Sequence, residues 1–417
     1  MLQNWLKIFL YNTKNNLLFT CLNILGLSIG VAGLVFSILY WNEEHSYNQW
    51  NPEKEHVFTV ATDLGGGKIW PHNVYPLAKY MKDVPEIEQF CYFNNWYFYE
   101  LLHYGQKKQQ INILDTQGNF FAFFPFEFTK GSAANALADS RSIALEETVA
   151  KNMFGNEDPV GKEITYSGRK MVVRGVYRIP GQSSLKPQAV TALMEETRLK
   201  NNENEWGNFN FGLMLKLKDP GQATAVKDKI DKIFLEYRSK PYAKSEGLSL
   251  EDYVKKEGSV TVLLEPLSMI RLHSVVDGMP EGKGNYQFLL IMAGLSVLIL
   301  ILSIVNYINL ATANAIKRAK EVGIRKIMGA SRRNIVWQFI FETVLTTFVA
   351  LILSLVIVEL VLPYYNDFMG KSLELTGSLF CLQLIVIFLV VVIVAGIFPA
   401  MYVANFETLK VLKGNFG

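Results

Sequence analysis

The chain has 417 residues, of which 50% are hydrophobic and 19% are charged, and its 41 basic and 38 acidic side chains leave a formal net charge of +3. This near balance gives no indication of a nucleic-acid or other polyanionic partner. The hydrophobic residues are concentrated in long uncharged runs, which excludes an ordinary soluble protein of two or three domains.

Four runs are long enough to cross a bilayer. No charge lies between Asn15 and Asn42, between Asn285 and Ile316, or between Leu375 and Phe406, and 334–366 carries only Glu342 and Glu359. A membrane helix needs roughly 20 apolar residues. We therefore predict spans at 17–41, 287–312, 334–362 and 378–403. The first is too long for the apolar part of a signal peptide, so we interpret it as an uncleaved anchor.

The basic residues near the span ends predict the orientation. They cluster before span one, between spans two and three, and after span four, whereas the loop at 363–377 has only Lys371. Basic loops remain in the cytosol. We expect 1–16, 313–333 and 404–417 to be cytosolic, and 42–286 and 363–377 to lie outside, in an inner membrane.

The large outer segment, 42–286, is predicted to be an α+β domain. Strand-like stretches alternate or carry β-branched residues, and helix-like stretches have near-helical apolar spacing. The strands are expected at 56–62, 109–116, 170–179, 211–217 and 259–267, and the helices at 146–154 and 221–240. The small, polar run near 130–145 suggests a porter-like domain with a subdomain inserted at about 131–187. The fold class is therefore a four-helix membrane protein with a large extracytoplasmic α+β domain.

Cysteine and motif counts give no sign of an enzyme. Cys21 and Cys381 fall in spans and Cys91 is alone outside, so no intrachain disulfide is expected. The stretch GNEDPVGKE departs from a phosphate-binding loop in its glycine spacing, and Glu163 stands where a Ser or Thr would be needed. The five histidines show no HExxH pattern. We predict no catalytic residue, no metal and no cofactor in this chain.

Polar and small residues inside the spans point to helix packing. Gly26, Gly30 and Gly33 form a small-residue stripe, which lets two helix backbones approach closely. Asn306 is an intramembrane polar residue. Glu342 should face protein, water or a cation rather than lipid. It either couples the cytosolic loop to the bundle or pairs with Arg332 or Arg333 near the interface, and the sequence leaves both interpretations open.

The segment 318–335, RAKEVGIRKIMGASRRNI, has six basic residues and one acidic residue. Placed on a helix, Ile316, Ala319, Gly323 and Ile327 share a face, Gly329 suits a C-cap, and Ser331 can cap the next helix. The rule that basic loops remain in the cytosol, or attraction to anionic lipid headgroups, would by itself explain the excess of basic residues. A docking helix for a cytosolic protein also explains the compact capped shape. The predicted docking residues are Glu321, Val322, Gly323, Ile324, Arg325, Lys326 and Gly329.

These segments resemble a known family. The run KRAKEVGIRKIMGASRRNIVWQFIFET resembles the coupling helix of FtsX-like and MacB-like ABC transporter permeases, which sits in a groove of the ATPase subunit. ETVAKNMFGNEDPVGKEITYSGRKMVVRGVYRIP and LNILGLSIGVAGLVFSILYWNEEHSYNQW resemble the MacB-type periplasmic core and its first span, and NFETLKVLKG resembles the C-terminal tail. NEEHSYNQW and EWGNFNFGLMLKL are similar to members from Bacteroidetes.

The resemblance implies a non-enzymatic permease subunit that transmits motion of a separate cytosolic ATPase, which holds ATP and magnesium, to its periplasmic domain. It implies a homo- or heterodimer, with membrane lipid, a periplasmic adaptor and an outer-membrane duct as further candidate partners, and no nucleic acid. The function would be efflux, or extraction of substrate from the periplasm or outer leaflet. The alternatives are an FtsX-like scaffold that controls a cell-wall hydrolase, and a sensor without an ATPase, which leaves the capped basic helix unexplained.

Overall fold

The computed structural model describes residues 2–317 and 319–404. The chain divides into two compact units. One consists of Met1–Glu43 with Tyr286–Gly417, and the other of Glu44–Asn285. We call them the membrane unit and the outer unit and describe each by itself.

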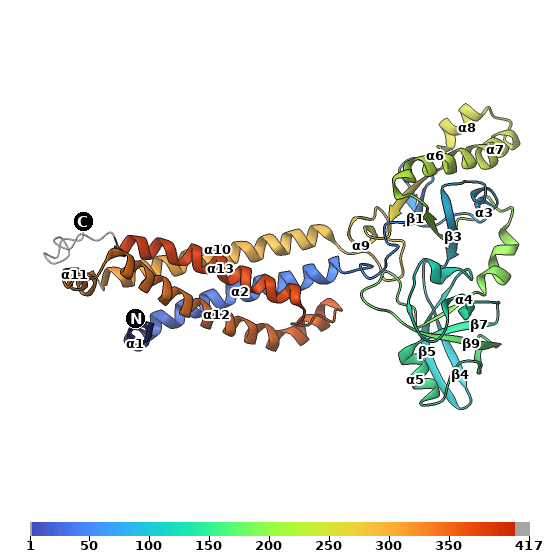
Figure 1. The fold of residues 1–417 in the computed structure, drawn as a ribbon. Helices are drawn as coiled ribbons and strands as arrows, with labels where there is room; N and C mark the ends of the chain where they lie inside the picture. The colour runs from blue at the N-terminus through green and yellow to red at the C-terminus, as the bar shows by residue number, and fades with distance from the viewer. Residues whose placement is uncertain (1, 318, 405–417) are drawn as a thin grey trace. The chain divides into compact units, whose positions relative to one another are not determined.

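The membrane unit is helical, and four of its helices are long and apolar enough to cross a membrane. In Figure 1, α2, α10, α12 and α13 run alongside one another, with α1 and α11 at the same end of the bundle. Its helices are α1 (Leu2–Asn15), α2 (Leu17–His45), α10 (Tyr286–Lys317), α11 (Ala319–Ile327), α12 (Arg332–Met369) and α13 (Ser378–Ala404). The four membrane-length helices confirm this half of the predicted fold class.

Two of these helices differ from the sequence-based ranges. Helix α12 continues through Pro363 to Met369, beyond the predicted end at 362. Proline removes one backbone donor, which a long, well-packed helix can tolerate. The helix ends only where Gly370 takes the left-handed conformation, with φ of 61°. The segment before the first span, for which the sequence predicts no structure of its own, forms helix α1.

The outer unit contains two sheets. The first has the strand order β12-β1-β11-β3, with β2 paired to β1, and the second has the order β6-β9-β7-β10-β5-β4-β8. The strands are β1 (Val57–Asp63), β2 (Ile69–Trp70), β3 (Ile87–Phe93), β4 (Phe98–Tyr104), β5 (Lys107–Asp115), β6 (Glu127–Gly131), β7 (Ser142–Glu146), β8 (Glu163–Tyr166), β9 (Arg169–Arg178), β10 (Ala189–Thr191), β11 (Gly212–Leu217) and β12 (Thr261–Pro266). The pairs β10–β5 and β7–β9 are parallel and the other pairs are antiparallel.

Short helices cover the sheets. The α-helices of the outer unit are α3 (Leu77–Met81), α4 (Ala133–Ala136), α5 (Glu147–Phe154), α6 (Ala223–Phe234), α7 (Lys240–Ser245), α8 (Leu250–Glu257) and α9 (Ile270–His273). Helix α6 buries Val226, Ile230 and Phe234 in the core of the first sheet. Helix α5 buries Val149 and Met153 in the core of the second. An aromatic cluster that includes Phe93, Phe120, Phe124, Tyr177 and Met214 draws on both sheets and joins them.

The five predicted strands correspond to β1, β5, β9, β11 and β12 within two residues at each end, and the α+β class is confirmed. The second sheet extends beyond the range of about 131–187 predicted for the inserted subdomain, at both ends. The second sheet begins at Phe98, because β4 forms a hairpin with β5, and it ends at Thr191 in β10. The polar run near 130–145 lies inside this sheet, between β6 and β7, and is not its boundary.

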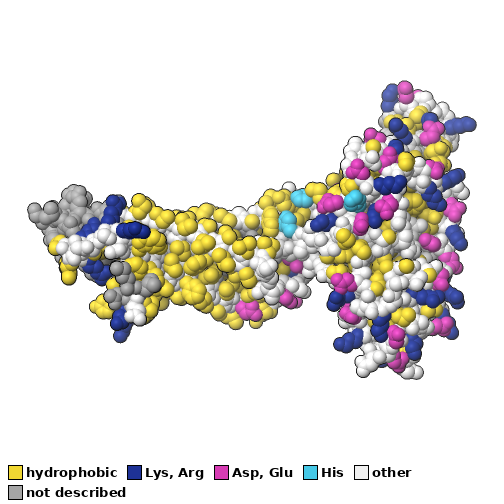
Figure 2. Space-filling model, viewed as in Figure 1, with side chains coloured by type: hydrophobic (Ala, Val, Ile, Leu, Met, Phe, Trp, Pro, Cys, Tyr) yellow, Lys and Arg dark blue, Asp and Glu magenta, His cyan; other side chains and the backbone are white. Residues whose placement is uncertain are grey.

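Side-chain types are distributed differently in the two units. Figure 2 shows an almost continuous apolar surface along the helices, with dark-blue Lys and Arg side chains at the end that carries α1 and α11, and mixed charges over the outer unit. The described basic residues at that end of the bundle are Lys7, Lys14, Arg325, Lys326, Arg332 and Arg333. This distribution is typical of a membrane protein.

Candidate functional site

Helix α11 is a short helix held between two caps. Gly329 has φ of 93°, and the N–H of Ala330 donates to the carbonyl of Arg325 over 3.0 Å, which is the long bond of a Schellman turn. Ser331 then accepts the N–H of Asn334 over 3.3 Å and starts α12. Both caps are predicted by the sequence, and the structure confirms them. They fix α11 as a separate element between the second and third spans.

Helix α11 buries one face and exposes the other. Val322 is 4% exposed and packs with Ile335, Phe339 and Ala400 of the bundle, and Gly323 is also buried. Other side chains here are large, apolar and exposed, with exposed fractions of 51% for Ile324 and 63% for Ile327 in α11, and 82% for Met328 just after it. Gly323 and Ile327, which the helical projection places on one face, therefore differ in burial.

A chain of hydrogen bonds connects α11 to the interior of α12. Nη1 of Arg325 donates to Oε1 of Gln338 over 2.9 Å, and Nε2 of Gln338 donates to Oε1 of Glu342 over 3.2 Å. Gln338 is only 6% exposed. We call these three residues the polar relay. Because an intramembrane carboxylate needs polar partners, the relay gives Glu342 a structural reason to occupy its position.

The remaining predicted docking residues lie in or beside α11. Burial and the nearby Arg332 lower the pKa of Lys326. Glu321 belongs to α11, but its side chain lies outside the described residues, as do Arg318 and residues 405–417 of the predicted cytosolic tail. Of the predicted set, Val322 and Gly323 face the bundle, Arg325 joins the relay, Ile324 faces outward and Gly329 is the cap.

The three glycines of the predicted stripe differ in how close their neighbours come. A Cβ atom at Gly30 would lie 2.6 Å from Oγ of Ser303 and 3.2 Å from Cα of Leu300, both on α10. At Gly26 it would meet Asn306 at an ordinary 3.7 Å, and at Gly33 nothing lies within 4 Å. Gly30 is therefore the position where α2 and α10 approach most closely.

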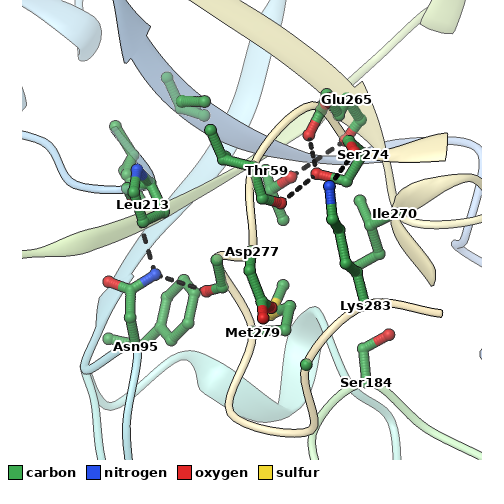
Figure 3. A pocket seen from close by; sticks show the side chains of 17 residues that line it. Thr59, Asn95, Ser184, Leu213, Glu265, Ile270, Ser274, Asp277, Met279 and Lys283 are labelled. Atoms are coloured by element: carbon green, nitrogen blue, oxygen red, sulfur yellow. Dashed lines mark hydrogen bonds between the residues drawn. The ribbon is translucent and has the colours of Figure 1, made fainter. Parts of the chain in front are cut away.

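In the outer unit, one concave region lies between the first sheet and the segment 274–283 (Figure 3). Glu265 accepts the N–H of Val275 over 2.7 Å, Lys283 donates to the carbonyl of Ser274 over 3.3 Å, and Asn95 donates to the carbonyl of Gly278 over 2.6 Å. Only about 20 Å³ remains, enough for about one water molecule, which needs roughly 10–15 Å³. The polar groups here fasten the segment to the sheet and leave no room for a small molecule.

A buried ion pair fastens the two ends of the outer unit. Nε and Nη2 of Arg271 donate to the two carboxylate oxygens of Glu44 over 2.7 and 2.8 Å. Nη1 donates to the carbonyls of Glu281 and Gly282 over 3.2 and 3.0 Å, and the guanidinium lies 4.0 Å from the ring centre of Tyr47. The bidentate geometry and the extra acceptors satisfy a charge that burial would otherwise make very costly.

A second buried carboxylate lies where the two sheets meet. Asp115 accepts the N–H of Met194 over 2.8 Å and the hydroxyl of Thr191 over 3.1 Å. Burial raises its pKa to about 6, despite these bonds and the charge of Arg198. Arg198 in turn donates to Asn94, which follows β3 of the other sheet. Asp115 thus fastens the end of β10 and the residue at 194 to β5, while Arg198 connects the same region to Asn94.

Sequence reasoning missed two of these contacts. Gln338 and Glu342 are four residues apart in an otherwise apolar helix, and this spacing places them on one face, so the pair could have been found. Glu44 and Arg271 are separated by 227 residues, and no local pattern connects them. Among the described residues, no group of three His, Cys, Asp or Glu side chains is arranged to hold a metal ion.

Two family models match this chain. The MacB-like periplasmic core domain matches residues 20–233, and the FtsX-like permease C-terminal domain matches residues 293–408. The first match includes helix α2 and most of the outer unit. The second includes α11, the polar relay and the last two spans.

Individual relatives are distant. The chain is 24% identical over 213 residues to the macrolide export ATP-binding/permease protein MacB of Neisseria meningitidis, which covers 50% of this chain and 28% of that protein. It is 23% identical over 245 residues to the ABC transporter permease YvrN of Bacillus subtilis, which covers 58% of this chain and 55% of YvrN. The matches thus span less than two thirds of the length of either relative.

Solved structures also resemble part of the chain. A domain of a protein described as a permease, from Porphyromonas gingivalis, has a TM-score of 0.42 at 17% identity and covers 52% of this chain and 91% of that domain. The periplasmic region of MacB from Actinobacillus actinomycetemcomitans has a TM-score of 0.32 at 14% identity and covers 51% of this chain and 92% of that region. The first family match alone includes half of the chain, and the second adds most of the remaining spans. The chain therefore belongs to the FtsX/MacB-like family of ABC transporter permeases.

Proposed function

We propose that this chain is a permease subunit that transmits ATP-driven motion of a separate cytosolic ABC ATPase across the inner membrane to its outer unit. In this proposal α11 is the element on which the ATPase pushes. The outer unit changes shape or position in response, and substrate is exported or extracted without passing through the helix bundle.

The exposed apolar face of α11 is the observation that carries the proposal. Ile324, Ile327 and Met328 lie in a segment with several basic residues. Placing this segment in lipid would be unfavourable because its basic side chains would lose their hydration. Contiguous exposed apolar side chains rimmed by charge are typical of a protein-binding surface. The caps and the polar relay support this role, because a helix that receives force must be anchored to the span that moves.

The distribution of charge supports the orientation. Basic residues gather at the end of the bundle that carries α1 and α11 (Figure 2), so by the positive-inside rule this end is cytosolic, together with both chain termini. The outer unit is then periplasmic. The ATPase and the basic helix lie on the same side of the membrane only in this orientation.

The names of the relatives support export. The MacB proteins of Neisseria are named as macrolide exporters, and their matches cover 50% of this chain. Control of a cell-wall hydrolase, the scaffold alternative, has no comparable support from the relatives. A macrolide is not proposed as the substrate here, because the matches leave most of the MacB length outside them.

A second copy of the permease is part of the proposal. Asn306 is exposed on α10 of the single chain, beside Gly26 of α2. An amide facing hydrocarbon is unfavourable, and amides commonly form hydrogen bonds between helices of neighbouring subunits. A partner chain placed against this face would cover Asn306.

The docking role is tested with the protein reconstituted in proteoliposomes with the ABC ATPase that copurifies with it. Gly323→Trp would push α11 off the bundle, and Arg325→Glu would break the relay and reverse a charge. Ile327→Glu changes only the exposed face. Each should reduce permease-dependent stimulation of ATP hydrolysis by about tenfold or more, since the loss of a central interface contact typically costs 2 kcal/mol or more.

The matched control is Val160→Glu, an exposed aliphatic residue of the outer unit at 36% exposure, which should retain full stimulation. Reconstituted amount and helix content are measured for every variant. Wild-type stimulation by Ile327→Glu and Arg325→Glu in correctly inserted protein would refute docking through α11.

A further inference from the structure

A polar cavity lies inside the membrane unit, next to the polar relay. Its volume is about 70 Å³, and side chains from α1, α2, α10, α12 and α13 line it. The polar lining residues are Asn12, Thr13, Thr20, Asn23, Tyr307, Asn314, Glu342, Thr343 and Thr346. Asn23 lies six residues into α2, about 9 Å along the helix at 1.5 Å per residue, so the cavity is in the half of the bundle nearer α11.

Four of the hydroxyl groups that line the cavity already have partners. Tyr307 donates to Thr343 over 3.0 Å, and Thr343 donates to the carbonyl of Phe339 over 3.1 Å. Thr346 donates to the carbonyl of Glu342 over 2.9 Å, and Thr20 to that of Asn16 over 3.2 Å. The bonds within and between helices thus account for these donors without any ligand.

Two amide atoms of the cavity have no partner among the described residues. They are Oδ1 of Asn23, whose residue is 5% exposed, and Nδ2 of Asn12. An unsatisfied buried polar atom costs about 1–3 kcal/mol, and more where hydrocarbon rather than water surrounds the protein. The orphaned atoms are one acceptor, on α2, and one donor, on α1.

This combination of a donor and an acceptor favours water over a metal cation as the ligand. A metal cation would bind the oxygen of Asn23 but would be repelled by the N–H group of Asn12. A water molecule can donate to the first and accept from the second. The cavity volume of about 70 Å³ exceeds the roughly 10–15 Å³ that one water needs, so the cavity has room for ordered water.

We propose that the cavity holds ordered water that bridges Asn12 and Asn23 beside Glu342, forming a hydrated joint between α1, α2 and α12. Water bridges exchange their hydrogen bonds readily, whereas direct contacts between side chains must break before helices can shift. Because Glu342 ends the relay that begins at Arg325, a movement of α11 would reach the first span through this joint. The role of the joint in transmitting motion rests on the proposed function, whereas the presence of water in the cavity does not.

Hydration is tested by thiol labelling, without the ATPase. Asn23→Cys is made in a chain whose three native cysteines are alanine and is placed in lipid nanodiscs. The matched control is Ser354→Cys, since Ser354 is fully buried in α12 and does not line the cavity. A dry site raises the pKa of a thiol, and each unit lowers the reactive thiolate about tenfold, so Asn23→Cys should react with methanethiosulfonate ethylammonium at least about tenfold faster. Equal rates would overturn the hydration.

A second measurement separates water from a cation. The thermal midpoint of the protein should be the same in sodium, potassium and choline chloride at equal ionic strength. A higher midpoint with sodium or potassium would mean that a cation occupies the cavity, which contradicts the inference.

The functional half is tested with Asn23→Leu, which fills the site with an apolar side chain of similar size. Stimulation of the ATPase should fall severalfold while docking, measured as copurification of the ATPase, is retained. Full stimulation by this variant would overturn the role of the joint and leave docking intact. The Ile327→Glu variant measures the loss of docking in a separate experiment.

Discussion

Arg271 illustrates how one residue can hold together parts of the chain that are far apart in sequence. It neutralises Glu44, at the start of the outer unit, and binds two carbonyls near its end. Gly284 completes the arrangement, since a Cβ atom there would lie 2.3 Å from Oε2 of Glu44. The close approach of the backbone to the ion pair therefore requires glycine at this position.

Removing Arg271 should destabilise the outer unit strongly. Arg271→Gln leaves the Glu44 carboxylate buried without its counter-charge, and breaking a buried pair in this way typically costs about 3–5 kcal/mol. The most protected amides of β1 and β11 should then exchange with deuterium at least about a hundredfold faster, measured by mass spectrometry on the intact chain.

Arg178→Gln is the matched control. Arg178 also pairs with a carboxylate, Glu127, but both side chains are more than half exposed. Exposed pairs contribute about 0–1 kcal/mol, so exchange should change by less than about fivefold. Equal effects of the two substitutions would show that burial of the Arg271 pair does not determine its contribution.

Individual residues also show what the sequence could predict. Gly329 and Ser331 act as caps because a local rule relates each residue type to its position, and both were predictable. The partners of Arg271 are set by the tertiary fold, which no local rule encodes. The exposure of Ile327 could not be predicted from the helical projection, because the projection places Ile327 and Gly323 on one face but does not show which neighbours cover each of them.

At the scale of elements, we expect alanine substitutions along the glycine stripe of α2 to differ in their effect on stability. Gly30→Ala would place a Cβ atom 2.6 Å from Ser303 and 3.2 Å from the α10 backbone, so α2 and α10 must separate. Separation weakens the close packing on which helix association in membranes depends. We expect a cost of about 1–3 kcal/mol for Gly30→Ala, which is the usual range for overpacking.

Gly33→Ala is the internal control, because the added methyl group meets nothing within 4 Å. It should match the wild type when the thermal stability of the protein is measured in detergent, while Gly30→Ala should unfold several degrees lower. If the two variants melt alike, the approach of α2 to α10 at Gly30 is looser than the structure shows. The positions of the three glycines in the sequence predicted the stripe, but only the packing of the helices distinguishes one glycine from another.

Strands were predictable where a segment is buried and rich in β-branched residues, as β9 and β11 are. No comparable pattern marks β4, whose burial alternates only weakly and whose residues include Glu100 and His103. Its place in the sheet depends on the hairpin with β5 and on pairing with β8. The boundary of the second sheet was missed for this reason.

The two units of the whole molecule differ in the hydrophobicity of their surfaces and in their charge. Between Trp41 and Tyr286 there are 29 basic and 32 acidic side chains, and the rest of the chain carries 12 basic and 6 acidic ones. The overall charge of +3 therefore hides an excess of basic residues in the membrane unit. Each unit also has its own buried clusters, three of them in the outer unit.

The outer unit should therefore fold without the spans. Residues 44–285 expressed alone should give a soluble monomer that melts in one cooperative transition, because the aromatic cluster around Phe120 and Tyr177 unites the two sheets. The transition should not respond to reducing agents, since Cys91 is the sole cysteine in this segment and its thiol is fully buried, with a pKa raised to about 12 by that burial. Circular dichroism and calorimetry measure both properties.

A shorter piece provides the control for this prediction. Residues 44–270 keep both sheets but lack Arg271 and the segment that it binds, so Glu44 loses its partner and the covering of β12 by 274–283 is lost. This piece should aggregate or melt at a much lower temperature. Two separate transitions in 44–285 would show instead that the sheets fold independently. The single-transition expectation depends on the shared aromatic core, whereas the difference between the two pieces depends on the fastening by Arg271 and Glu265.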